Sequence, residues 1–352
     1  MARTEPTVCD LLRLLVGRRV AVLTGAGIST DSGIPDYRSP DSPPSNPMTI
    51  TQFTGDPAFR QRYWARNHIG WRHMADTAPN LGHVALAALE EAGVVNGVIT
   101  QNVDLLHTKA GSRSVVDLHG SYATVVCLSC GKSVSRALLA ERLEELNPGF
   151  IERAGRLSGI AVAPDADAVV SDTASFRFVD CRHCGGILKP DIVYFGESVP
   201  KDRVAQAYSV LDEADALLVA GSSLTVYSGF RFVRHAAARG IPVGIVNRGT
   251  TRGDELATVK IDGGCSAVLA LLASELVPAV QRGSTQESRS WDRRMGRAVQ
   301  LGSTQESRSW DRRMGRAVQR GSTQESRSWD RRISRAVQRS WDRRWTPANS
   351  AR

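Results

Sequence analysis

The sequence predicts an α/β fold with a doubly wound parallel sheet. Short apolar runs, bounded by glycine turns, alternate with helix-forming segments along most of the chain. Glycine or polar residues follow several of these runs, as is typical of the carboxyl ends of parallel strands. The alternation stops between residues 127 and 187 and then resumes, which indicates a small inserted module. A repetitive segment follows the last predicted helix.

The predicted elements follow in chain order. A buried strand over residues 19–24 ends at the Gly25 turn. Six prolines lie within residues 35–57, so loops rather than a crossover helix are expected there. Helices are expected over residues 59–74, 83–92, 136–146, 230–238 and 267–277, and further strands over 97–100, 115–118, 216–220 and 243–246.

A tandem repeat occupies the C-terminal end. GSTQESRSWDRRMGRAVQ begins at residue 283 and again at 302, and a variant begins at 321, so the period is 19 residues. Each copy has too few apolar residues to stack as a solenoid, and residues 282–352 are therefore expected to be a disordered tail. Arginine-mediated binding of RNA or DNA is the alternative, and its affinity would fall with added salt.

The net charge of +9 comes entirely from this tail. From Arg282 onward there are 18 arginines and 7 acidic residues, which leaves 27 basic and 29 acidic residues before it. Residues 1–281 thus show no basic footprint for nucleic acid. No run approaches the roughly 20 apolar residues of a membrane span, and the N-terminus lacks the pattern of a signal peptide. We expect a cytoplasmic protein without membrane contacts.

Four of the six cysteines form two CxxC pairs, Cys127 with Cys130 and Cys181 with Cys184. In a reducing compartment such pairs are more often metal ligands than disulfides. Four thiolates satisfy tetrahedral zinc and leave no open position, so the metal would be structural. The 50 residues between the pairs exceed the roughly 15–20 of a zinc ribbon, so two unrelated reduced pairs are the alternative.

Four predicted strand ends carry residues suited to a dinucleotide. They are Gly25-Ala26-Gly27, Gln101-Asn102-Val103-Asp104, Gly221-Ser222-Ser223 and Asn247-Arg248-Gly249. Small residues at such positions let backbone N–H groups approach phosphates. A dehydrogenase would continue with a helix and an acidic residue about 20 positions on, which the prolines disfavour. The proline-rich segment is expected to lie over the ligand as a flap.

Together these motifs resemble the sirtuins, the NAD-dependent protein lysine deacylases. The matching runs are GAGISTDSGIPDYR (25–38), TQNVDLLH (100–107), LHG (118–120), both CxxC pairs, LKPDIVYFGE (188–197), GSSLTVYS (221–228) and IVNRG (245–249). GIPDYR, RQRYWARN (60–67) and LNPG followed by APDAD are most similar to the class II branch.

The resemblance implies a catalytic domain over residues 1–281. Its large Rossmann-like lobe would comprise residues 8–38, 76–126 and 188–281, and its small lobe residues 39–75 with a zinc module over 127–187. The zinc module would bind one structural Zn²⁺ per subunit. The implied activity transfers an acyl group from lysine to ADP-ribose and releases nicotinamide.

The resemblance also assigns site residues. His119 would be the general base, and Asn102 would act beside it in the nicotinamide pocket. NAD would contact Gly25, Ala26, Gly27, Asp36, Tyr37, Arg38, Gln101, Asn102, Val103, Asp104, Gly221, Ser222, Ser223, Asn247, Arg248, Gly249 and Cys265. From the residues alone, a core histidine at 119, a helix cap at Asp104 and a small buried hydrophobe at Cys265 are the alternatives.

An acylated-lysine protein substrate is expected to add as a strand between the lobes, against Phe195, Gly196 and Val226. Tyr63 and Arg66 lie three apart on a predicted helix and hence on one face. Sirtuins that remove succinyl and malonyl groups carry a similar pair, whose arginine binds the acyl carboxylate. A preference for acidic or branched acyl chains follows, with a surface arginine beside a core tyrosine as the alternative. A mono-ADP-ribosyltransferase and an NAD-sensing module are the other functions that the motifs allow.

Overall fold

The computed structural model describes residues 6–39, 47–155 and 173–283. The predicted disordered tail from residue 284 onward and the APDAD run (163–167) lie outside the described residues. No helix in the described ranges is long and apolar enough to cross a membrane.

A six-stranded parallel sheet forms the centre of the large lobe, and it confirms the predicted doubly wound fold. The strand order is β3-β2-β1-β7-β8-β9. The strands are β1 (Val20–Thr24), β2 (Val95–Thr100), β3 (Val115–Asp117), β7 (Ala216–Ala220), β8 (Val243–Asn247) and β9 (Val259–Asp262). Every residue of β1, β7 and β8 is buried, because helices cover both faces of the sheet. Thr24 is level with Thr100 and Ala220, so the three strands end together.

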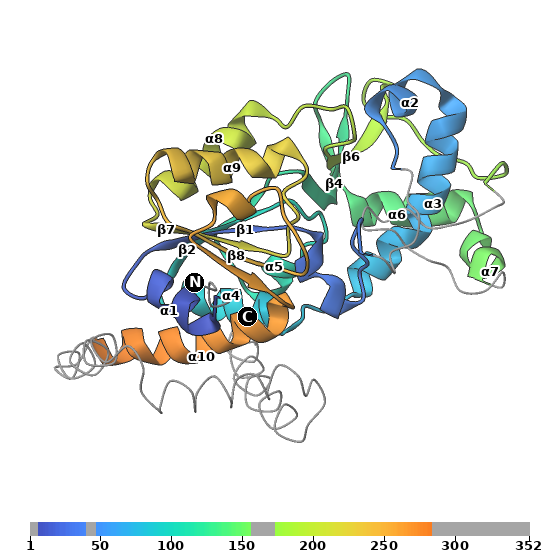
Figure 1. The fold of residues 1–352 in the computed structure, drawn as a ribbon. Coiled ribbons are helices and arrows are strands. Elements are labelled where there is room, and N and C mark those ends of the chain that lie inside the picture. The colour runs from blue at the N-terminus through green and yellow to red at the C-terminus, as the bar shows by residue number, and fades with distance from the viewer. Residues whose placement is uncertain (1–5, 40–46, 156–172, 284–352) are drawn as a thin grey trace, which may run out of the picture. The chain divides into compact units, whose positions relative to one another are not determined.

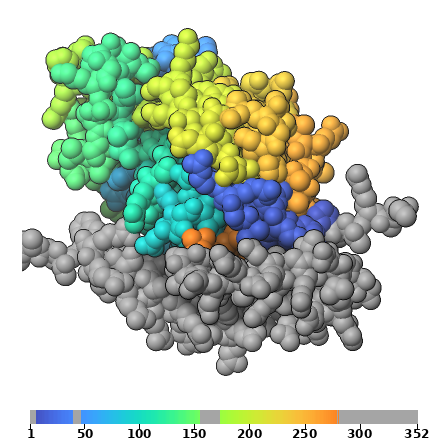
Figure 2. All heavy atoms as spheres, turned by 90° about the vertical axis from the view of Figure 1, so that its left-hand side faces the viewer, coloured from blue at the N-terminus to red at the C-terminus, as the bar shows by residue number. Residues whose placement is uncertain are grey.

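Helices pack on each face of this sheet, as Figure 1 shows. One face carries α1 (Val8–Leu15), α4 (Leu81–Glu91) and α10 (Cys265–Gly283), and the other carries α8 (Lys201–Asp212) and α9 (Tyr227–Ala238). The space-filling view in Figure 2 shows the N-terminal segment in blue beside the orange segment that contains β8 and β9. Leu11 of α1 lies so close to Gly244 of β8 that a larger residue at 244 would clash with it.

The chain between β1 and α3 confirms the expected absence of a long crossover helix in its described part. It forms two short 3-10 turns, η1 (Ala26–Ile28) and η2 (Thr30–Ser32), and then the six-residue α2 (Ile50–Gly55). The predicted aromatic helix is α3 (Pro57–Asp76), which begins with a proline at its first position and an Asp56 cap.

The small lobe contains an antiparallel sheet in the order β5-β4-β6. Its strands are β4 (Gly120–Cys127), β5 (Ser133–Ser135) and β6 (Leu188–Ile192), and its helices are α2, α3, α6 (Arg136–Leu146) and α7 (Phe150–Gly155). Aromatic and aliphatic side chains from these elements share one core. The predicted boundaries placed residues 120–126 and 188–192 with the large lobe, whereas these residues pair with each other here.

Candidate active site and cysteine cluster

Two glycine turns pack directly on each other where β1 and β7 end. Gly25 donates its N–H to the Ala220 carbonyl at 3.3 Å, and Gly27 donates to the Gly221 carbonyl at 2.8 Å. A β-carbon on Gly25 or Gly27 would lie about 3 Å or less from residues 221–222. These two N–H groups therefore bond within the protein, and the glycines are required by backbone packing as well as by any ligand.

A hydrogen-bonded chain joins Asn102, Ser29 and Asp104 beside these turns. Asn102 Nδ2 donates to the Gly25 carbonyl at 3.1 Å and to Ser29 Oγ at 3.0 Å. Ser29 Oγ donates in turn to Asp104 Oδ2 at 2.6 Å. Asp104 Oδ1 accepts from the Leu106 N–H at the start of α5 (Leu106–Ala110), so this carboxylate also serves the capping role that its sequence position suggested. Ser29 was not among the predicted site residues, although it lies within the GAGIS run.

Two fully buried histidines lie behind this chain of hydrogen bonds. They are His83 and His107, and their ring centroids are 4.8 Å apart. His107 Nε2 lies 2.9 Å from Thr24 Oγ1. Burial lowers the pKa of His83 to about 4 and that of His107 well below its ordinary value. Both imidazoles are consequently neutral at neutral pH, and sequence reasoning missed them because each resembles an ordinary helical residue.

His119 lies just after β3, where its two ring nitrogens have different partners. Nδ1 lies 2.9 Å from the Gln101 carbonyl oxygen, and Nε2 lies 2.7 Å from Ser228 Oγ. A carbonyl only accepts, so Nδ1 carries the hydrogen and Nε2 keeps its lone pair. Burial lowers the pKa of His119 to about 4, against the opposing effect of the Gln101 carbonyl. The half-buried ring is thus a neutral base. It is hydrogen-bonded to Gln101, the residue before Asn102.

The remaining predicted cofactor residues lie on the same strand ends or on the flap. Ser222 Oγ donates to Gln101 Oε1 at 2.7 Å, which links β7 to β2. Arg38 of the flap donates to Ser223 Oγ at 3.4 Å. Asp36 accepts the backbone N–H of Arg38 at 2.8 Å. Tyr37 and Val103 are half-buried, and Val103 packs against the small-lobe core.

The β8 end holds the last group of predicted cofactor contacts. Asn247 is buried and donates to the Arg248 carbonyl at 2.7 Å, whereas Arg248 is exposed. Gly249 has a left-handed φ of 71°. Cys265 begins α10, and burial raises the pKa of its thiol to about 12, so it is an unreactive small side chain.

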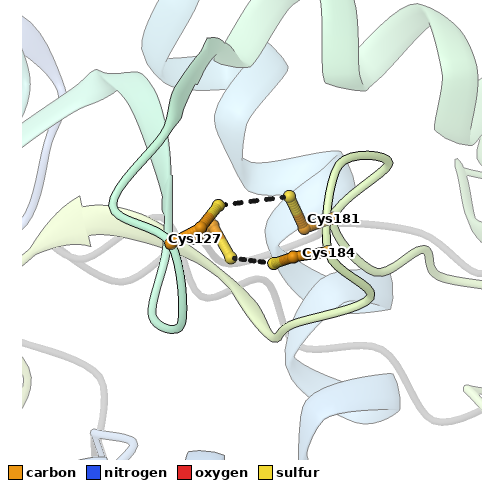
Figure 3. A group of neighbouring side chains, drawn as sticks. Cys127, Cys181 and Cys184 are labelled. Atoms are coloured by element: carbon orange, nitrogen blue, oxygen red, sulfur yellow. Dashed lines mark hydrogen bonds between the residues drawn. The ribbon is translucent and has the colours of Figure 1, made fainter.

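The two CxxC pairs come together in the small lobe, and their four sulfurs lie within 4.8 Å of one another. Figure 3 shows Cys127, at the end of β4, facing Cys181 and Cys184 in the loop before β6. Cys127 and Cys184 sulfurs are 3.5 Å apart, and those of Cys130 and Cys181 are 3.8 Å apart. Ligands at the Zn–S distance of about 2.3 Å would be separated by about 3.8 Å in a tetrahedron. All four cysteines are free thiols.

Electrostatics at this cluster also favour a cation. The Cys130 backbone N–H lowers the pKa of Cys127 to about 6. The Gly186 backbone also favours a thiolate at Cys184, but the neighbouring sulfurs raise the pKa of Cys184 to about 12. A cation between the four sulfurs would stabilise them as thiolates at this distance. The cluster fits a structural zinc site, which excludes the alternative of two unrelated pairs.

Comparison with known proteins identifies the family. A sequence profile of the Sir2 family matches residues 25–228. The chain belongs to the Sir2 family. The NAD-dependent protein deacetylase 1 of Mycobacterium avium is 78% identical over 269 residues, which cover 76% of this chain and 95% of the relative. The NAD-dependent protein deacetylase 1 of Streptomyces coelicolor is 53% identical over 256 residues, which cover 72% of this chain and 84% of the relative.

Solved sirtuin structures share the fold. A structure described as Sir2 with a p53 peptide and NAD+ has a TM-score of 0.61 and 32% identity, and the match covers 76% of this chain and 98% of that one. A structure of Sir2 bound to an acetylated peptide has a TM-score of 0.58 and 30% identity, with coverage of 76% and 98%.

The segments predicted to hold the substrate of this sirtuin are both exposed. Phe195 is 47% exposed and Val226 is 39% exposed. The Phe195 carbonyl accepts the Ile50 N–H at 3.0 Å, so part of this segment already bonds to α2. Gly196 has a left-handed φ of 81° with open space around its α-carbon, apart from one distant contact with Ile50.

The predicted acyl-recognition pair lies beside one of these segments. Tyr63 is buried, and its ring packs edge-on against Tyr194 at 5.4 Å, directly before Phe195. Arg66, one turn further along α3, is half-buried. Tyr63 is therefore both a core residue and a neighbour of the predicted peptide segment.

Proposed function

We propose that this sirtuin is an NAD-dependent protein-lysine deacylase that transfers the acyl group to ADP-ribose and releases nicotinamide. One observation carries the proposal: a neutral imidazole at the carboxyl edge of the sheet, with Nδ1 held by a carbonyl and its Nε2 lone pair directed at a hydroxyl. Such a ring is unprotonated at neutral pH, which a general base must be before it takes a proton. The names of the relatives and the peptide-bound and NAD-bound Sir2 structures support it.

When bound, NAD supplies the electrophilic anomeric carbon and nicotinamide as the leaving group. Asn102 would present its amide to the nicotinamide end, with Asp104 and Ser29 holding that amide in place. Gln101, fixed by Ser222, would contact the ribose. His119 would take the proton of a ribose hydroxyl at Nε2. Asn247, Arg248 and the Cys265 backbone would contact the adenosine half.

The flap and the outer segments would complete the site. Asp36, Tyr37 and Arg38 would lie over the cofactor, since Arg38 already reaches Ser223 in the turn after β7. An acylated lysine peptide would add as a strand at Phe195, Gly196 and Val226. We further infer a class II type of sirtuin from the GIPDYR and RQRYWARN runs.

The test measures nicotinamide release from NAD with an acylated lysine peptide, for the parent and for His119→Ala. We expect the parent to form deacylated peptide and O-acyl-ADP-ribose, and the variant to lose about 10²- to 10⁴-fold in deacylation. Mass spectrometry follows the ADP-ribose. If it is recovered on protein, the enzyme is a mono-ADP-ribosyltransferase, and if NAD binds without turnover, the chain is an NAD-sensing module.

A further inference from the structure

The base in this site is not directly open to a substrate hydroxyl. Ser228 Oγ lies 2.7 Å from His119 Nε2, which is the shortest hydrogen bond of the ring. Because Nδ1 carries the ring hydrogen, Nε2 can only accept, and the serine hydroxyl must donate to it. The Nε2 lone pair, which would accept the ribose proton, therefore already accepts a hydrogen bond from Ser228.

The residue after Ser228 lies against Gln101, whose carbonyl orients the imidazole. Ser228 is the second residue of α9, and Gly229 follows it. A β-carbon on Gly229 would lie 2.6 Å from Gln101 Nε2, so the first turn of α9 presses against the Gln101 side chain. The Gln101 carbonyl meanwhile binds His119 Nδ1. Gln101 thus contacts His119 through its carbonyl and the residue after Ser228 through its side chain.

A serine hydroxyl can donate one hydrogen bond and accept others at the same time. A hydroxyl of the substrate could donate to Ser228 Oγ while Ser228 still donates to Nε2. Enzymes with an activated nucleophile use a similar set of three groups: a hydroxyl, a base that it donates to, and a third group that orients the base. Here these groups would be Ser228, His119 and the Gln101 carbonyl.

We propose that Ser228 relays the proton from the substrate hydroxyl to His119 Nε2, an inference that rests on the proposed deacylase function. The substrate O–H bond breaks and its proton moves to Ser228 Oγ, while the original Ser228 proton moves to Nε2. The electron pair stays on the substrate oxygen, which bonds to the acyl carbon while the π pair between that carbon and the lysine nitrogen moves onto the nitrogen. Ser228 ends as it began, and His119 becomes an imidazolium.

The first test uses the protein without ligands. In ¹⁵N NMR spectra at neutral pH, the His119 Nε2 resonance of the parent should show a lone pair that accepts a hydrogen bond. Ser228→Ala should move this resonance toward the position of a free lone pair, and Ser228→Thr should restore it. An unchanged resonance in Ser228→Ala would overturn the proposal.

The second test separates the two stages of the reaction. Ser228→Ala should keep exchange of labelled nicotinamide into NAD within about twofold, because that stage needs no base, and should lose about tenfold in kcat for deacylated peptide. Ser228→Thr should recover most of that loss. The solvent isotope effect should indicate two moving protons in the parent and one in Ser228→Ala. Ser209→Ala, on the exposed side of α8, is the matched control.

The outcomes are distinguishable. A parent chain that neither exchanges nicotinamide nor forms deacylated peptide contradicts the deacylase assignment itself. An active parent with an unchanged Ser228→Ala variant, or with equal losses in exchange and deacylation, contradicts only the relay.

Discussion

Gly221 of the β7 turn packs on Ile28 so closely that a β-carbon on the glycine would lie 2.2 Å from the Ile28 backbone nitrogen. Gly221 also has a φ of 67°, in the left-handed region. This contact joins two strand-end loops that are far apart in the sequence.

Gly221→Ala should therefore destabilise the protein strongly. The left-handed conformation alone costs about 1–2 kcal/mol for alanine, and the clash adds about 1–3 kcal/mol. Gly240→Ala is the matched control, since Gly240 has a similar φ of 69° and open space around it. Urea unfolding should show a loss near 1 kcal/mol for Gly240→Ala and about 3 kcal/mol for Gly221→Ala. Equal losses would mean that the close packing has no energetic role.

Removal of one cysteine of the zinc cluster should release the metal and destabilise the small lobe. Cys130→Ser is expected to reduce bound zinc from about one per chain to a small fraction, and to lower the free energy of unfolding by about 3 kcal/mol or more. Cys9→Ser, outside the cluster, should retain the zinc. Elemental analysis and urea unfolding measure both effects, and full stability after chelation would refute a structural metal.

Arg136 is an unusual buried cation of the small lobe. It is 0% exposed, its guanidinium carbon lies 4.7 Å from the Trp71 ring centroid, and it donates to Asn67 Oδ1 at 3.1 Å. Burial lowers its pKa to about 10, and its Nε and Nη1 atoms have no hydrogen-bond partner within the described ranges.

Replacement of this cation by an apolar side chain of similar length should therefore be tolerated. Arg136→Met should stay within about 1 kcal/mol of the parent or exceed it in stability, because a buried charge is desolvated at a large cost. Arg136→Ala leaves a cavity and should lose about 2–4 kcal/mol. Thermal or urea unfolding of the two variants checks this, and similar losses in both would show that the charge itself stabilises the lobe.

The buried histidines should make the protein sensitive to acid. His83 has a folded pKa of about 4, below its ordinary 6.5, so the unfolded chain binds the proton more readily. Its contribution to stability is present above pH 6.5 and is lost as the pH falls toward 4, by about 3 kcal/mol. His83→Gln should show a shallower loss over this range in urea unfolding. An identical pH dependence in both proteins would contradict the assignment.

The acyl specificity can be tested at Arg66. We expect the parent to deacylate succinyl- or glutaryl-type or branched acyl peptides faster than acetyl peptides, because a guanidinium binds a carboxylate with charge-assisted hydrogen bonds. Arg66→Ala should lose about tenfold on the acidic acyl groups and little on acetyl. Arg62→Ala, an exposed arginine of the same helix, is the control. A clear acetyl preference of the parent would defeat this prediction.

Several features of the small lobe could not be predicted from the sequence. β4 and β6 form one sheet although about 60 residues separate them, because antiparallel pairing depends on spatial contact rather than on local pattern. β6 also contains a lysine and a proline, which conceal its strand character. The burial of Arg136 could not be predicted either, because an arginine on a charged helix is usually exposed.

The sequence by itself determined the alternation of strands and helices, the interruption by the cysteine module and the identity of the residues at the strand ends, because these follow from local periodicity, turn residues and motif spacing. Only the tertiary structure decided which atoms meet. The parallel register brings Gly25, Gln101 and Gly221 to one edge, and the fold places Ser228, 109 residues away in the chain, on the lone pair of His119. Such contacts arise from the packing of separate elements, and no local pattern of residues encodes them.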